Sequence, residues 1–269
     1  MAELPPWRGR LRRLSSRGYA GGVIKQHRAM LQIRRSRSTA AGGLLLPLFF
    51  TLVQAALLGP TLRLWRALFE FWSARLELGL RIGVRILHLG VAAVSLPQVS
   101  RVQVLFSSDA WWAILGACLL LFLSTYLVRP GRWLPLIYSV RAAVIVQGTA
   151  LAVFALAPAS FAWTAEDHVN TGLLVSVWLL FLIPWFLGLT HYLFDFPLRR
   201  KVVLTLVILA YFTLAMPVQY LLHLYVLQHC SLLLLPVLYL LFGLFLDVLL
   251  LVALYAWGMS WRWGQAREE

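Results

Sequence analysis

Residues 231–257 decide the fold of this chain: they read SLLLLPVLYLLFGLFLDVLLLVALYAW and contain one charged residue, Asp247. The run is long enough to cross a bilayer as a helix, because about 20 apolar residues at a rise of about 1.5 Å each span the hydrocarbon layer. A carboxyl group at such a position is stable only where other helices cover it. The chain before residue 231 therefore has to supply a helical bundle.

The composition agrees with a membrane bundle. Hydrophobic residues make up 61% of the 269 residues, charged residues make up 13%, and the mean hydropathy is +0.80. Soluble domains are about 45–50% apolar and about 25% charged. Alternating segments of about 10 residues, as in a transmembrane β-barrel, do not occur in the sequence. The composition therefore predicts an all-α polytopic membrane protein.

The apolar runs predict about six transmembrane helices. Besides residues 231–257, they cover 43–59, 110–128, 133–157, 172–194 and 202–227. The first run is short and bounded by Gly43 and Pro60, so it either crosses the membrane or forms a re-entrant segment. The expected organisation is a basic arm (1–42), an apolar and charged segment (43–97), a five-helix bundle (98–263) and a polar tail (264–269).

Residues 61–96 carry polar side chains at helical spacing. The spacing predicts one amphipathic charged helix, which lies in the membrane interface or contacts another subunit. Two of the i,i+4 pairs along this stripe join opposite charges, and such pairs stabilise a helix by about 0.2–0.5 kcal/mol each. The stripe consists of Arg63, Arg66, Glu70, Glu77, Arg81, Arg85 and His88.

Positive charge is concentrated at the N-terminus. The net charge is +14, and residues 1–42 contain ten Lys or Arg against one acid, Glu3. We expect this arm, including Arg34, Arg35 and Arg37, to bind anionic lipid headgroups or an acidic partner. Arginine is used almost to the exclusion of lysine, which indicates a GC-rich genome, and no nucleic-acid partner is expected.

Basic residues also predict the orientation. The turns at 129–132 and 199–201 and the C-terminal tail hold seven Lys or Arg, whereas the opposite connections hold one, Arg101. The positive-inside rule then places both termini in the cytoplasm, and we expect a bacterial inner membrane. A mitochondrial or other organellar inner membrane is the alternative, because the arm resembles a transit peptide in being Arg-rich and acid-poor. Which side holds residues 61–96 depends on whether 43–59 crosses.

Catalytic and metal-binding motifs are absent from the sequence. There is no G-x-S-x-G, H-E-x-x-H, P-loop or G-x-G-x-x-G. The two cysteines, Cys118 and Cys230, form no C-x-x-C, and His223 and His229 are poorly spaced as metal ligands. We therefore expect no metal site, no cofactor and no catalytic residues.

Two polar features remain inside or beside the apolar runs. Arg141 lies eight residues from Trp133, and Asp247 lies ten residues from Trp257, so both are about 12–15 Å from the same interface. We predict that they form an intramembrane ion pair; alternatively, Arg141 reaches the interface along its stem, or Asp247 is protonated. A second cluster, at the level of the lipid headgroups, consists of His191, Asp195, Arg199, Arg200 and Lys201.

The sequence alone favours a non-catalytic integral subunit that anchors or scaffolds a multi-protein membrane complex. Its expected partners are the anionic bilayer surface, bound by the arm, and other subunits, bound by the arm and the charged helix. A transporter or proton-conducting subunit that uses Arg141 and Asp247 is the first alternative. A membrane enzyme that acts on a lipid-linked substrate at the headgroup-level cluster is the second.

Overall fold

The computed structural model describes residues 37–89, 92–102, 104, 108–129, 131, 133–157, 161, 163–193 and 198–260, most of which are helical. The contacts divide the chain into two units. The first unit consists of Met1–Leu52 and Leu182–Thr205, and the second of Val53–Phe181 and Leu206–Glu269.

Within these described ranges, six helices are long and apolar enough to cross a membrane, as the apolar runs predicted. Residues 43–59 lie inside the first of these helices, and the choice between a crossing and a re-entrant segment stays a prediction. The candidate spans are Gly42–Arg75, Asp109–Leu127, Leu134–Leu156, Ala165–Thr190, Leu198–His229 and Leu232–Gly258.

Most spans correspond to one helix, whereas the last span is composite. Its short 3₁₀ and π-helical pieces adjoin Pro236 and Gly243, the two residues of this run that disfavour a regular helix. In chain order the elements are α2 (Arg37–Arg75), β1 (Arg81–Leu89), β2 (Ala92–Ser100), α3 (Ser108–Leu127), α4 (Leu134–Leu156), α5 (Ala165–Leu193), α6 (Leu198–His229), η4 (Leu232–Leu234), α7 (Leu235–Tyr239), η5 (Leu240–Phe245) and α8 (Leu246–Ser260).

The predicted amphipathic helix over 61–96 is wrong beyond Arg75, where α2 ends. Glu77 and Gly79 adopt left-handed conformations with φ of 53° and 59°, and the Leu78 amide donates to the Ser73 carbonyl at 3.0 Å. This arrangement terminates an α-helix. The charge stripe misled the prediction because a spacing of four residues keeps Arg81 and Arg85 on one face of a strand as well as of a helix.

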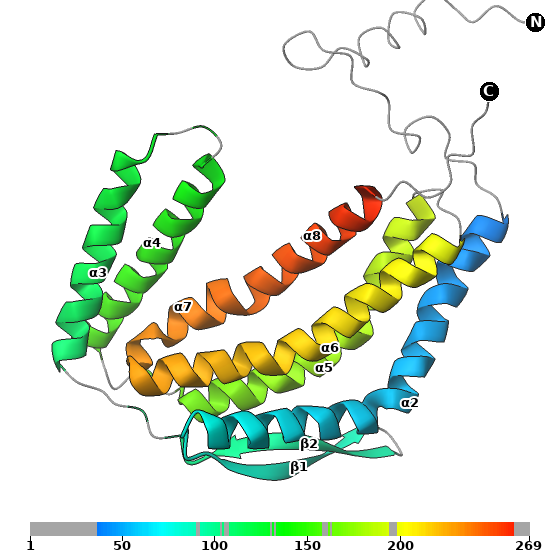
Figure 1. Ribbon diagram of the computed structural model, residues 1–269, viewed down its shortest axis with the longest axis horizontal. Helices are drawn as coiled ribbons and strands as arrows, with labels where there is room; N and C mark the ends of the chain where they lie inside the picture. Colours follow the sequence, from blue (N-terminus) through cyan, green and yellow to red (C-terminus); the bar gives the residue numbers. More distant parts are fainter. Residues whose placement is uncertain are drawn as a thin grey trace, which may run out of the picture. The chain divides into compact units, whose positions relative to one another are not determined.

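Residues 81–100 instead form an antiparallel hairpin of β1 and β2, which lies along the C-terminal part of α2 (Figure 1). Val84 opposes Pro97, and because proline has no N–H, this pair directs its backbone groups away from the partner strand. By the same alternation, the backbone N–H and C=O of Val99 point away from β1. The Asn170 side chain pairs with both groups: it donates to the Val99 carbonyl at 2.9 Å and accepts from the Val99 amide at 2.8 Å.

A tryptophan of α2 compensates for a proline in α6. Pro217 lies inside α6 and has no N–H to donate to the carbonyl of Thr213, four residues earlier. The indole Nε1–H of Trp65 donates to that carbonyl at 2.8 Å, and the Trp65 side chain is fully buried. A free carbonyl in hydrocarbon is strongly unfavourable, so this contact lets α6 carry a proline within a membrane span.

Close helix packing also occurs in the first unit. A Cβ atom at Gly188 of α5 would overlap the Pro47 ring and crowd the Gly43 carbonyl of α2. The glycine therefore permits these two helical segments to approach one another, as small residues commonly do between membrane helices.

Candidate functional site

The N-terminus of α5 positions a buried histidine. The Thr164 hydroxyl accepts from the Asp167 amide at 3.1 Å, while the Asp167 carboxylate accepts from the Thr164 amide at 3.2 Å. This reciprocal cap starts the helix at Ala165 and places His168 in its first turn. The His168 side chain is 2% exposed.

The π-helical segment η5 frees a backbone carbonyl in the last span. The Leu246 amide donates to the Gly243 carbonyl, so the Phe242 carbonyl loses the partner that a regular helix would give it. Two side chains of α6 take that place: Gln219 Nε2–H donates at 2.8 Å and His223 Nε2–H at 3.1 Å. Single π-turns of this kind often accompany functional sites.

A hydrogen bond joins His168 to His223 inside the protein. The distance from His168 Nε2 to His223 Nδ1 is 3.0 Å, and His223 is 1% exposed. Because the Phe242 carbonyl only accepts, His223 carries its proton on Nε2, and its Nδ1 accepts from His168 Nε2–H when both rings are neutral. Nδ1 of His168 is then a proton acceptor at the end of a directed chain. It has no partner among the described residues.

Aromatic rings enclose the histidine pair. The centroid of the Tyr220 ring lies 5.9 Å from that of His168 and 5.5 Å from that of His223, and the Tyr239 ring lies 5.9 Å from that of His168. Gly172 of α5 leaves room for Tyr220, since a Cβ atom at residue 172 would overlap the Tyr220 ring. These contacts fix the orientation of both imidazoles.

Asp247 lies in the first turn of α8, directly after η5. Its carboxyl group is beside the Gln219 amide and within electrostatic range of the Tyr220 hydroxyl. The side chain is 4% exposed, and Oδ1 has no hydrogen-bond partner within the described part of the chain. Asp247 is therefore a second buried proton acceptor that is not fully satisfied.

We name His168, Gln219, Tyr220, His223 and Asp247 the histidine–aspartate cluster. All five come from segments that qualify as membrane spans. In the described ranges, no group of three or more His, Cys, Asp or Glu side chains could hold a metal ion. Two imidazoles and a carboxyl group can instead bind and exchange protons.

The structure does not bring Arg141 and Asp247 together. Arg141 Nε donates to the Thr125 hydroxyl of α3 at 3.0 Å, and its guanidinium carbon lies 4.6 Å from the centroid of the Tyr126 ring. Equal depth on two helices does not make them neighbours: α4 packs against α3 and against the start of the last span, before α8 begins. The predicted ion pair is replaced by a hydrogen bond and a cation–π contact.

The residues predicted to bind partners are divided among several elements. Arg63, Arg66 and Glu70 lie exposed on α2, where Arg66 and Glu70 form an ion pair of 2.7 Å. Glu77 lies in the turn after α2, and Arg81 and Arg85 lie exposed on β1. Residues 1–36 of the arm, with Arg34 and Arg35, lie outside the described residues, as do the side chains of Arg37 and His88, and the last residues of the predicted arm belong to α2.

The headgroup-level cluster is only partly described. Arg199, Arg200 and Lys201 lie in the first turn of α6, with Arg199 exposed and the other two half-buried. Asp195 and the side chain of His191 lie outside the described residues. The lipid-linked enzyme alternative, which depends on these two residues, stays a prediction.

The comparisons with known proteins provide no relative. No family model, no curated protein and no solved structure matches this chain. The function is therefore argued from the cluster itself.

Proposed function

We propose that this multi-pass membrane protein binds and releases protons within the bilayer, as a proton-conducting protein. One observation carries the proposal: the hydrogen-bonded pair His168–His223 is buried, and unpartnered acceptor atoms remain at His168 Nδ1 and Asp247 Oδ1. This is the transport alternative from the sequence, with His168 and His223 in place of Arg141 and with Asp247 retained.

The unpartnered acceptors argue against a purely structural cluster. Most buried polar groups in folded proteins have a hydrogen-bond partner, and an unpaired buried atom requires an explanation. Here both unpaired atoms are sites that a proton occupies. An imidazole can accept a proton on one nitrogen and release another from the opposite nitrogen, so a proton taken up at His168 Nδ1 can drive transfer of the Nε2 proton to His223 Nδ1. Release of a proton from His223 Nε2 then requires its hydrogen bond to the Phe242 carbonyl to open.

Proton flux into liposomes tests the proposal. The full-length protein is reconstituted around a pH-sensitive dye, and a potassium diffusion potential drives protons inward. We expect acidification faster than in protein-free liposomes, and we expect Asp247→Asn and His168→Gln to return the rate to the protein-free level. His229→Gln serves as the control, because His229 is exposed and its Nδ1 contacts the carbonyl of Tyr225 in its own helix.

Wild-type liposomes that acidify no faster than empty ones would contradict the proposal. Equal loss of flux in His229→Gln and His168→Gln would also contradict it, because the flux would then not depend on the cluster. Each variant is first checked for a single folded peak by gel filtration in detergent.

A second function, the anchoring of a membrane complex, is favoured by the outer edge of β1. The alternation set by Pro97 turns the backbone groups of Ile82, Val84 and Ile86 outward, and within the described ranges they have no hydrogen-bond partner. The side chains of Val84 and Ile86 are exposed. An open edge of this kind can accept an extended segment of another protein as a third strand.

Proline substitution on β1 tests the second function. Val84→Pro removes an outward N–H without breaking a bond to β2, whereas wild-type β1 can pair with an added strand. We expect Val84→Pro to lose proteins that copurify with the wild type in mild detergent, while Val84→Thr retains them. An identical set of copurifying proteins for the two variants would remove this edge as a docking site.

A further inference from the structure

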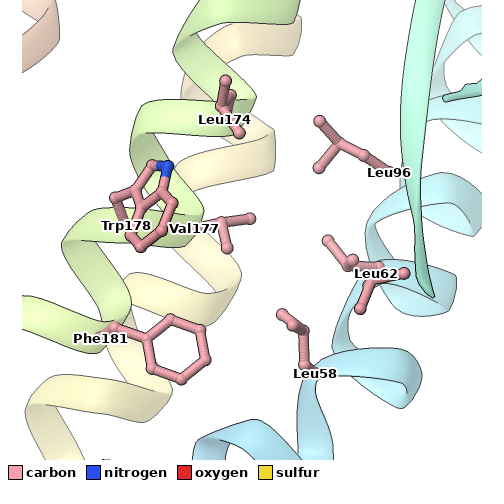
Figure 2. Close-up of a pocket in the computed structure, with 8 residues that line it drawn as sticks. Leu58, Leu62, Leu96, Leu174, Val177, Trp178 and Phe181 are labelled. Atoms are coloured by element: carbon pink, nitrogen blue, oxygen red, sulfur yellow. The ribbon is translucent and has the colours of Figure 1, made fainter. Parts of the chain in front are cut away.

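An apolar groove separates α5 from α2 and β2 in the second unit. Figure 2 shows Leu174, Val177 and Phe181 of α5 on one side and Leu58, Leu62 and Leu96 on the other, and Trp178 of α5 also contributes to the lining. Val94 of β2 completes the lining, and no polar atom contributes to its surface. Such a space does not hold water, because water needs two to four polar partners.

Most residues that line the groove belong to candidate membrane spans, so its surroundings are lipid. Leu58 and Leu62 belong to the candidate span Gly42–Arg75, and residues 174–181 belong to the candidate span Ala165–Thr190. A hydrocarbon chain fills an apolar gap between membrane helices and restores the van der Waals contacts that the lining residues otherwise lack. The groove therefore fits an acyl chain.

Two arginines extend this apolar site with positive charge. Arg85 is the cross-strand partner of Leu96, so its side chain leaves the hairpin on the same face as Leu96. Arg81 lies four residues earlier on the same face, opposite Ser100. Both arginines are exposed, and among the described residues neither forms an ion pair. A guanidinium group suits a phosphate, which it can bind through two parallel hydrogen bonds.

We propose that this groove is a binding site for one anionic phospholipid of the surrounding bilayer. An acyl chain occupies the space between α2, β2 and α5, and Arg85, assisted by Arg81, binds the phosphate. The site is separate from the histidine–aspartate cluster and does not depend on proton transport. It is also separate from the basic arm, since all its residues lie between 58 and 181.

Native mass spectrometry of the full-length protein tests the proposal. The protein is equilibrated with equal amounts of phosphatidylglycerol and phosphatidylcholine and released from detergent. We expect one phosphatidylglycerol per chain. Arg85→Gln should reduce the retained fraction roughly tenfold, because a charge-assisted hydrogen bond is lost. Arg129→Gln is the matched control, since Arg129 is exposed in the connection between α3 and α4.

Filling the groove provides the second arm of the test. Val177→Phe places a ring in the acyl-chain space and should abolish lipid retention, whereas Val175→Phe should retain lipid because Val175 is exposed and does not line the groove. If Val177→Phe fails to fold, the comparison of Arg85→Gln with Arg129→Gln decides alone.

Three outcomes overturn the proposal. The first is equal lipid retention by Arg85→Gln and Arg129→Gln. The second is equal retention of the two lipids by the wild type. The third is a wild-type mass that corresponds to a second protein chain and no lipid, which would make a copy of this chain the occupant.

Discussion

Replacing Gly172 by alanine should destabilise the folded protein by about 1–3 kcal/mol, the usual cost of overpacking a well-packed interior. The added Cβ would overlap the Tyr220 ring, and that ring is held against His168 and His223. Either α5 has to move away from α6, or Tyr220 has to leave the cluster. Unfolding by denaturant in detergent micelles measures the free-energy difference.

Gly148→Ala is the matched control for this prediction. Gly148 lies inside α4, and a Cβ atom there would meet nothing within 4 Å. Both substitutions replace a helical glycine and gain the same helix propensity, so the difference between them isolates the steric overlap. Equal stability of the two variants would show that α5 and α6 do not approach as closely as described.

Reversing the charges at Arg141 and Asp247 should produce the largest loss of folded protein, with no rescue in the double variant. Arg141→Asp places a carboxylate against the negative face of the Tyr126 ring. Asp247→Arg places a cation beside the Gln219 amide and the Tyr220 hydroxyl. Each reversed side chain loses the partners of the residue that it replaces, and an unpaired charge at the centre of a membrane helix costs about 2.5–3.5 kcal/mol on insertion scales, so each change should be severe.

The double reversal decides whether the two residues interact. Residues without shared partners contribute additively, so the double variant should be as harmful as the sum of the single variants. The yield of monodisperse protein after gel filtration is the readout, and Arg129→Asp is the control for reversing an exposed arginine. Substantial recovery in the double variant would mean that Arg141 and Asp247 touch, contrary to the separate partners found for each.

The membrane spans could be predicted because length and hydropathy nearly determine them. A helix satisfies its own backbone groups, so an apolar run of about 20 residues needs no knowledge of its neighbours to be assigned. The predicted run 133–157 and the helix Leu134–Leu156, for example, differ by one residue at each end. Where the run is short, as at 43–59, the same rule left two topologies open.

The spacing of charged residues over 61–96 predicted a helix, whereas the conformational preferences of the glycines and β-branched residues in this segment favour strands. Spacing by four residues does not distinguish a helix from a strand. Gly79, Gly83 and the β-branched residues Ile82 and Val84 do distinguish them, since glycine weakens a helix and β-branched residues favour strands. Gly79 adopts a left-handed conformation, which glycine tolerates better than other residues, so its identity is informative at this turn.

The histidine pair is predictable from position along the helices, since His168 and His223 lie near the ends of their helices. The same kind of argument predicted the wrong partner for Arg141. The predicted spans 133–157 and 172–194 leave His168 in the connection between them. The capping residues Thr164 and Asp167 would have started α5 at Ala165, and His168 then lies in the first turn of α5, while His223 lies within the last two turns of α6. The freed carbonyl of Phe242 has no comparable signal, because Gly243 alone does not specify a π-turn.

Trp65 and Pro217 constrain the order in which this sequence can change. As long as residue 217 is a proline, the Thr213 carbonyl depends on the Trp65 indole, so loss of the tryptophan exposes an unpaired carbonyl to hydrocarbon. If residue 217 is replaced by a residue with an N–H, that N–H can donate to the Thr213 carbonyl, and the hydrogen bond from residue 65 is no longer required. A lineage can therefore lose the proline first and the tryptophan second, while the reverse path passes through a destabilised intermediate.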